Sequence, residues 1–124
     1  MSAGTLILVA TPIGNLGDMT QRATEALSNA DAVCCEDTRR TGLLLQHLGI
    51  SGKKYIVINE HTEHDACEEV VQRILGGSNV ALVSDAGTPG ISDPGERLVK
   101  AALSSGITVS AMPGASALTM ALVM

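Results

Sequence analysis

The feature of this 124-residue sequence that most constrains its fold is a set of short apolar runs. Each run is rich in Val, Ile, Leu or Ala and is nearly continuous, without the strict alternation that marks a strand with one wet face. The runs are Thr5–Thr11, Ala32–Cys35, Tyr55–Asn59, Val80–Ser84 and Thr108–Met112. Continuous apolar strands are typical of parallel sheets that are buried on both faces. The runs therefore predict the strands of a parallel sheet.

Stretches with helical spacing separate these runs, because their apolar residues recur three and four positions apart. They are Thr20–Asn29, Thr41–Leu48, Asp65–Leu75 and Gly95–Ser105, with Gly49 as a plausible stop for the second. Alternating strands and helices predict an α/β fold: a doubly wound five-stranded parallel sheet flanked by helices on both faces. Since the sequence has no Phe, no Trp and one Tyr, the core must be aliphatic.

Charge and cysteine content limit the environment and the partners. The formal net charge of −5 argues against this domain alone holding a nucleic acid, because phosphate binding needs clustered Lys and Arg. The three cysteines are an odd number, which indicates a reduced, intracellular protein. The N-terminal run Leu6–Ala10 is too short for a signal peptide or a membrane span. We expect a cytoplasmic protein that does not enter a membrane.

Loops that follow strands carry the ligand sites of such sheets. Ser84–Gly95 is the most informative of them, because a loop this long and this rich in Gly, Pro and Asp is seldom needed merely to join a strand to a helix. It is expected to present N–H groups and Asp85 to a ligand. Thr11–Asp18 lacks the third glycine of a dinucleotide-binding loop, and Pro113–Ala117 offers small residues against which a flat ligand could lie. Ordinary turns remain the alternative for both.

Two further segments combine charged groups. Glu36–Thr41 places two carboxylates beside two guanidinium groups, either where dinucleotide enzymes hold a ribose or as a helix start capped by Asp37 or Thr38. His61, His64 and Cys67 have a spacing of three residues, which drifts around a helix and would not converge on a metal ion. We expect no metal site there and a solvated helix entry instead.

Together these motifs resemble a known family. The segments that carry the resemblance are Val9–Asp18 (VATPIGNLGD), Glu36–Arg39 (EDTR), Thr41–Leu44 (TGLL), His61 with Glu63, Leu82–Gly95 (LVSDAGTPGISDPG) and Pro113–Gly114. In this order they resemble the bacterial small-subunit ribosomal RNA cytidine 2'-O-methyltransferases of the tetrapyrrole methylase superfamily. Members of that family commonly have Asn after the histidine, where this chain has Thr62.

The resemblance implies a methyl donor, a substrate and an assembly. The donor would be S-adenosylmethionine without a metal, the substrate a ribose 2'-hydroxyl in small-subunit ribosomal RNA, and the assembly a homodimer. Donor-binding roles carry over to Pro12, Asp85, Gly87, Thr88, Ser116 and Ala117. Asp37, Arg39 and His61 are the candidate catalytic residues, although the base could also lie in a second domain.

The end of the sequence bears on domain organisation. Ala115–Met124 is apolar on nearly every side, which is typical of a helix buried against further structure. We expect this chain to be the N-terminal, donor-binding domain of a two-domain enzyme; the alternative is a helix that covers the sheet unaided. Other functions stay open: a relative that methylates a tetrapyrrole or a protein, or a non-catalytic nucleotide-binding module.

Overall fold

The computed structural model describes residues 3–10, 20–59, 61–84 and 93–111, in which strands and helices alternate. The strands are β1 (Thr5–Ala10), β2 (Ala32–Cys35), β3 (Lys54–Val57), β4 (Val80–Ser84) and β5 (Thr108–Ala111). The helices are α1 (Gln21–Asn29), α2 (Thr38–His47), α3 (Glu63–Leu75) and α4 (Asp93–Ser104). This order confirms the predicted alternation.

The strands form one parallel sheet in the order β3-β2-β4-β1-β5. The register places Cys34 opposite Leu82 and Ala10 opposite Ser84, so the central strands end at a common level. β2 is buried throughout, as a continuous apolar run predicts for a central strand. β3 and β5 are the edge strands and are partly exposed.

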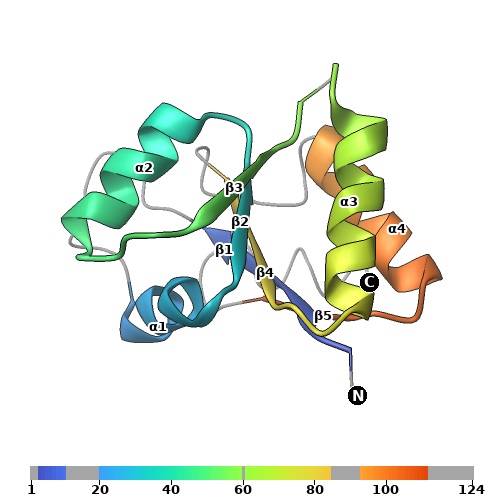
Figure 1. Ribbon diagram of the computed structural model, residues 1–124, viewed down its shortest axis with the longest axis horizontal. Coiled ribbons are helices and arrows are strands. Elements are labelled where there is room, and N and C mark those ends of the chain that lie inside the picture. The colour runs from blue at the N-terminus through green and yellow to red at the C-terminus, as the bar shows by residue number, and fades with distance from the viewer. Residues whose placement is uncertain (1–2, 11–19, 60, 85–92, 112–124) are drawn as a thin grey trace.

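Helices cover both faces of the sheet, which makes the fold doubly wound as predicted. Figure 1 shows α1 and α2 on one side of the strands and α3 and α4 on the other. Neighbouring residues of one strand point to opposite faces. Val33 therefore packs with Leu27 of α1 and Leu45 of α2, whereas Cys34 packs with Val70 of α3 and Val99 of α4.

Helix ends follow from local chemistry. Thr20 caps α1 by accepting the Ala23 N–H at 3.1 Å. Gly49, Gly77 and Gly106 have positive φ angles directly after α2, α3 and α4, a conformation that glycine adopts without strain. The prediction that α2 begins at Thr41 was wrong. The helix begins three residues earlier, at Thr38, because Asp37 caps it.

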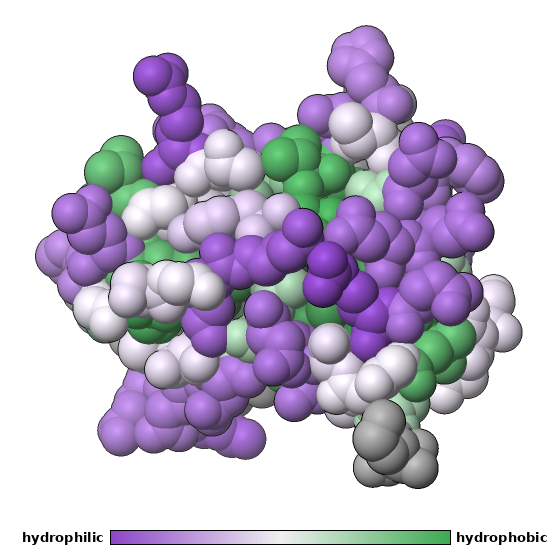
Figure 2. Space-filling model, viewed as in Figure 1, coloured by the Kyte–Doolittle hydropathy of each residue, from purple (hydrophilic) through white to green (hydrophobic). Residues whose placement is uncertain are grey.

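The described surface is mostly polar. Figure 2 shows hydrophilic side chains over most of one face, with hydrophobic residues in small separate patches. Within the described ranges, no helix is both long enough and apolar enough to cross a membrane.

Candidate functional site

The strand order creates one position where neighbouring connections diverge. From β2 the chain leads outward through α2 to β3, and from β4 it leads through α4 to β5 at the opposite edge. β2 and β4 are neighbours, and α2 and α4 lie on opposite faces of the sheet. In open α/β sheets, ligands bind outside the carboxyl ends of the strands at such a divergence. The end of the sheet at which the strands have their carboxyl termini is therefore the candidate site. We call it the carboxyl edge.

Asp37 lies at this edge, immediately after β2, and performs a structural task. Its Oδ1 accepts hydrogen bonds from the Arg39 N–H at 2.9 Å and the Arg40 N–H at 3.3 Å. These bonds satisfy two of the free N–H groups in the first turn of α2. The interpretation of Asp37 as a helix cap is therefore confirmed.

Arg39 and Arg40 are both exposed in the same turn. The N-terminus of a helix carries partial positive charge, so two guanidinium groups there are unfavourable for α2. Neither side chain forms an ion pair with another described residue. Both remain available to an anion, and guanidinium groups are well suited to phosphate oxygens.

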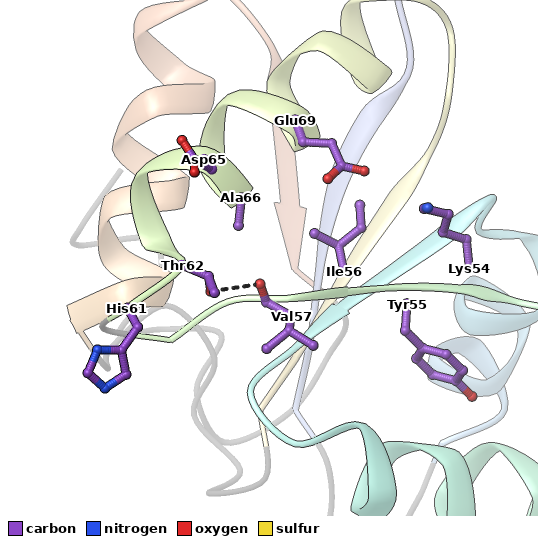
Figure 3. Close-up of a pocket in the computed structure, with 9 residues that line it drawn as sticks. All are labelled: Lys54, Tyr55, Ile56, Val57, His61, Thr62, Asp65, Ala66 and Glu69. Carbon is purple, nitrogen blue, oxygen red and sulfur yellow. Dashed lines mark hydrogen bonds between the residues drawn. The ribbon is translucent and has the colours of Figure 1, made fainter.

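The turn between β3 and α3 positions His61 through hydrogen bonds of its neighbours. Asn59 Oδ1 accepts the N–H groups of His61 at 2.8 Å and Thr62 at 3.1 Å. Thr62 Oγ1 accepts the Asn59 N–H at 3.2 Å and donates to the Val57 carbonyl at 3.0 Å (Figure 3). We call this pair, Asn59 and Thr62, the β3–α3 clasp. His61 is exposed at the tip of the turn.

A groove of about 310 Å³ runs beside the clasp, between the edge strand β3 and α3. It is lined by Lys54, Tyr55, Ile56, Val57, His61, Thr62, Asp65, Ala66 and Glu69. Figure 3 shows Lys54 and Glu69 at one end, while the His61 ring lies at the other end and points away from both. The charged groups of the groove do not converge on one point. The groove lies beside the edge strand β3 rather than between β2 and β4. We do not assign a ligand to it.

Sequence reasoning missed a buried polar group at the carboxyl edge. Thr41 is 1% exposed, and its Oγ1 has no hydrogen-bond partner among the described residues. It precedes the buried residues Leu44 and Leu45 by three and four positions, so it shares their face of α2. That spacing was the available signal, because it places a hydroxyl in an apolar stripe.

The cysteine and histidine residues show no nucleophile or metal site in the described ranges. Burial is the largest cause that raises the pKa of the Cys34 thiol well above its usual range, and charges on Cys35, Cys67 and Glu69 add to it. A thiol held in its neutral form is a poor nucleophile. His61 and His64 are exposed and Cys67 is half-buried, and no described group of three such side chains could hold a metal ion.

The residues expected to bind the donor lie outside the described residues. They are Pro12, Asp85, Gly87, Thr88, Ser116 and Ala117. The strands that precede them are described, and β4, β1 and β5 are consecutive in the sheet. Ala10 pairs with Ser84, so β1 and β4 end side by side at the carboxyl edge.

A doubly wound parallel sheet with helices on both faces places the chain in the α/β class. Comparison with known protein families identifies the family within this class. The chain belongs to the tetrapyrrole (corrin/porphyrin) methylase family, whose model matches residues 5–124.

Individual relatives are more informative still. The chain is 53% identical over 120 residues to the ribosomal RNA small subunit methyltransferase I of Synechocystis sp., covering 97% of this chain and 43% of that protein. It is 53% identical over 116 residues to the enzyme of the same name from Streptococcus pyogenes, covering 94% and 40%. This confirms the resemblance to the small-subunit methyltransferases. The chain spans about two fifths of the length of these relatives.

A solved structure supports the fold. Uroporphyrin III C-methyl transferase from Thermus thermophilus superposes with a TM-score of 0.67 at 20% sequence identity, over 95% of this chain and 52% of that one. At this identity the likeness shows the shared fold alone.

Proposed function

We propose that this chain is the donor-binding domain of a methyltransferase that modifies a ribose 2'-hydroxyl of small-subunit ribosomal RNA. The observation that carries the proposal is the 53% identity, over nearly the whole chain, to proteins named ribosomal RNA small subunit methyltransferase I. The same observation favours RNA over a tetrapyrrole substrate, because the uroporphyrin enzyme is only 20% identical.

S-adenosylmethionine would supply an electrophilic methyl group at the carboxyl edge. Two features of the described residues fit such a ligand: the divergence of the chain after β2 and β4, and the buried Thr41 hydroxyl without a partner. We assign donor contacts to Pro12, Asp85, Gly87 and Thr88, which follow β1 and β4, and to Ser116 and Ala117, which follow β5.

Three residues of the described edge would act on the RNA. Arg39 would hold a phosphate, because its guanidinium group is exposed and makes no ion pair with the described residues. His61 would accept the proton of the ribose hydroxyl, since its exposed imidazole makes no side-chain hydrogen bond within the described ranges. Asp37 is the weaker candidate base, because its Oδ1 already accepts two N–H groups of α2.

The net charge of −5 and the relatives' greater length suggest how the domain would work. We propose that a second domain supplies the rest of the donor cleft and most of the RNA contacts. The complete protein would be a cytoplasmic homodimer that acts without a metal. The chain alone would bind the donor weakly and transfer methyl groups slowly. A sedimentation experiment tests self-association of the chain, and a clean monomer at micromolar concentration would argue against it.

Methyl transfer to small ribosomal subunits tests the function directly. The chain would be compared with a chimera in which it replaces the matching part of the Synechocystis relative. We expect methylation of a ribose 2'-oxygen by the chimera and much slower transfer by the chain. Methylation of a base, or none by a folded chimera, would refute the proposed reaction. A chain as fast as the chimera would refute the need for a second domain.

Donor binding provides an independent test. We expect the chain to bind S-adenosylmethionine in preference to NAD, whereas a dinucleotide-binding module would show the reverse. Because a hydrogen bond to a charged group contributes about 1.5–3 kcal/mol, Asp85→Ala should weaken donor binding by about tenfold or more. Unchanged affinity in a folded variant would remove Asp85 from the site.

A further inference from the structure

The clasp at the start of α3 divides its hydrogen bonds between the residues just before the helix and the end of β3. Thr62 occupies the N-cap position of α3, where a threonine hydroxyl usually accepts an N–H from the first turn of its own helix. Here Thr62 makes no such bond. Its hydroxyl instead donates to the Val57 carbonyl at 3.0 Å, at the end of β3. The Thr62 hydroxyl thus links the turn to the sheet, while Asn59 Oδ1 accepts the N–H groups of the two residues that precede α3, much as Asp37 accepts two N–H groups at the start of α2.

Asn59 completes the same arrangement from the other side. Its Oδ1 accepts the N–H groups of His61 and Thr62, and its own N–H donates to Thr62 Oγ1 at 3.2 Å. The Ile58 N–H donates to the Cys35 carbonyl at 2.9 Å, which extends the pairing of β3 with β2 up to the turn. Ile58, before His61, and Thr62, after it, are therefore both hydrogen-bonded to the sheet.

These bonds hold a single exposed residue in place. Figure 3 shows Thr62 bonded back to Val57, with the His61 side chain projecting from the tip of the turn. Two side chains, Asn59 and Thr62, therefore hold the turn from which His61 projects.

We propose that Asn59 and Thr62 are positioning residues, which fix the backbone of His61 so that its imidazole meets the ribose hydroxyl at the carboxyl edge. The proposal rests on the role given to His61 under the proposed function. The Thr62 hydroxyl serves both sides of the turn, because it donates to the Val57 carbonyl and accepts the Asn59 N–H.

The first test measures the turn itself in the intact chain. Asn59→Ala and Thr62→Val remove the clasp bonds, whereas Asn59→Asp and Thr62→Ser keep the oxygen that makes them. Amide hydrogen exchange at His61 and Thr62 should speed up about tenfold or more in the first pair and stay near wild type in the second. Unchanged protection in Asn59→Ala would overturn the proposal, because the clasp would then not order the turn.

The second test measures whether the clasp acts through His61. In the chain and in the chimera, Asn59→Ala should lower kcat about tenfold with little change in the donor's KM, since misplacement of a reacting group acts on the rate. Asn59→Asp should restore the rate. The double variant Asn59→Ala/His61→Ala should be no slower than His61→Ala alone.

Each remaining outcome has one meaning. If the two losses multiply in the double variant, Asn59 acts independently of His61 and the positioning role is wrong. If His61→Ala alone leaves the rate unchanged, the role proposed for His61 is wrong, and with it the reason for positioning. If neither wild-type protein methylates RNA while the exchange results hold, it is the proposed function that fails.

Discussion

The amino and carboxyl ends of the parallel strands, here the amino edge and the carboxyl edge of the sheet, differ in how their polar side chains are hydrogen-bonded. At the amino edge, Asn79 Oδ1 accepts the N–H and the hydroxyl of Thr5 at 3.0 and 3.1 Å. The Asn79 N–H donates to Asp31 Oδ2, and the Asp31 N–H donates to the Asn79 carbonyl, each at 2.8 Å. These bonds join residues up to 74 positions apart, so this edge holds the strands in register.

Among the described residues, the carboxyl edge leaves several of its polar side chains unpaired, although Asp37 and the β3–α3 clasp are hydrogen-bonded there. Glu36, Arg39, Arg40 and His61 are exposed and make no side-chain hydrogen bond or ion pair within the described ranges. Thr41 is buried, and within the part of the chain that the structure describes its hydroxyl has no hydrogen-bond partner. A buried polar group without a hydrogen bond lowers stability, so this edge is not built for stability alone. The comparison teaches that described polar side chains without hydrogen-bond partners gather at the edge that carries the candidate site, whereas those of the amino edge hold the strands in register.

Gly4 gives the largest expected effect and tests the structural edge. An added Cβ would lie 1.8 Å from the Ser78 carbonyl oxygen, and that oxygen belongs to backbone that cannot move aside easily. The Gly4 N–H also donates to the Ile74 carbonyl at 2.8 Å. We expect Gly4→Ala to lower the free energy of unfolding by about 3 kcal/mol or more, measured by urea denaturation.

Gly76→Ala is the matched control for Gly4→Ala. Its added Cβ would lie 3.4 Å from the nearest atom, and its φ of −81° suits an ordinary residue. We expect a change of about 0.5 kcal/mol or less. Equal losses at Gly4 and Gly76 would mean that the close approach of Gly4 to Ser78 does not constrain the amino edge.

A matched pair of asparagines sharpens the comparison further. Asn79→Ala leaves the part-buried N–H of Thr5 without its acceptor, so the free energy of unfolding should fall by about 2 kcal/mol. Asn59→Ala changes exposed bonds in the β3–α3 clasp and should cost less than about 1 kcal/mol. The rate of methyl transfer should show the opposite order, with a larger loss in Asn59→Ala than in Asn79→Ala. A larger stability loss at Asn59 would contradict the division between edges.

Much of the fold could be predicted because strand burial leaves a direct mark on the sequence. The runs Ala32–Cys35 and Val80–Ser84 match β2 and β4 to the residue, since both strands lie inside the sheet. The edge strand β3 matched less well, starting one residue early and ending at Val57 rather than Asn59. Edge strands are half exposed and therefore contain polar residues, so the sequence indicates their first and last residues less clearly.

The site could be predicted only in part. Asp37 was a candidate both for a cap and for a catalytic group, and local sequence cannot separate a carboxylate that accepts two N–H groups from a free one. The clasp was not foreseeable, because Thr62 bonds to the Val57 carbonyl, and which carbonyl a hydroxyl reaches depends on how the chain turns. The donor residues, such as Asp85, lie outside the described residues and stay a prediction.

Removal of the Thr41 hydroxyl should have a smaller effect, and it should raise the free energy of unfolding rather than lower it. Thr41→Val keeps the side-chain shape and removes the hydroxyl that lacks a partner, so the free energy of unfolding should rise by about 1 kcal/mol. Thr41→Ser retains the hydroxyl and loses a methyl group, so it should not stabilise the chain. Thermal and urea unfolding would measure both. A loss of stability in Thr41→Val would mean that the hydroxyl is satisfied in solution, and the carboxyl edge would then resemble the amino edge.

Substitution of Lys53, whose side chain reaches the C-terminal end of α1, should have the smallest effect on stability. That helix has no basic residue in its last turn, and the Lys53 ammonium group, which is distant in sequence, donates to the carbonyls of Ser28 and Ala30. A cation at a helix C-terminus contributes about 0.3–1 kcal/mol, and salt weakens the effect. We expect Lys53→Met to lower the free energy of unfolding by about 0.5 kcal/mol at low salt and by less in molar salt. Lys54→Met is the control, because Lys54 is exposed and makes no hydrogen bond within the described ranges. Since both variants remove one positive charge, equal losses would trace the effect to net charge and leave no special role for Lys53 at α1.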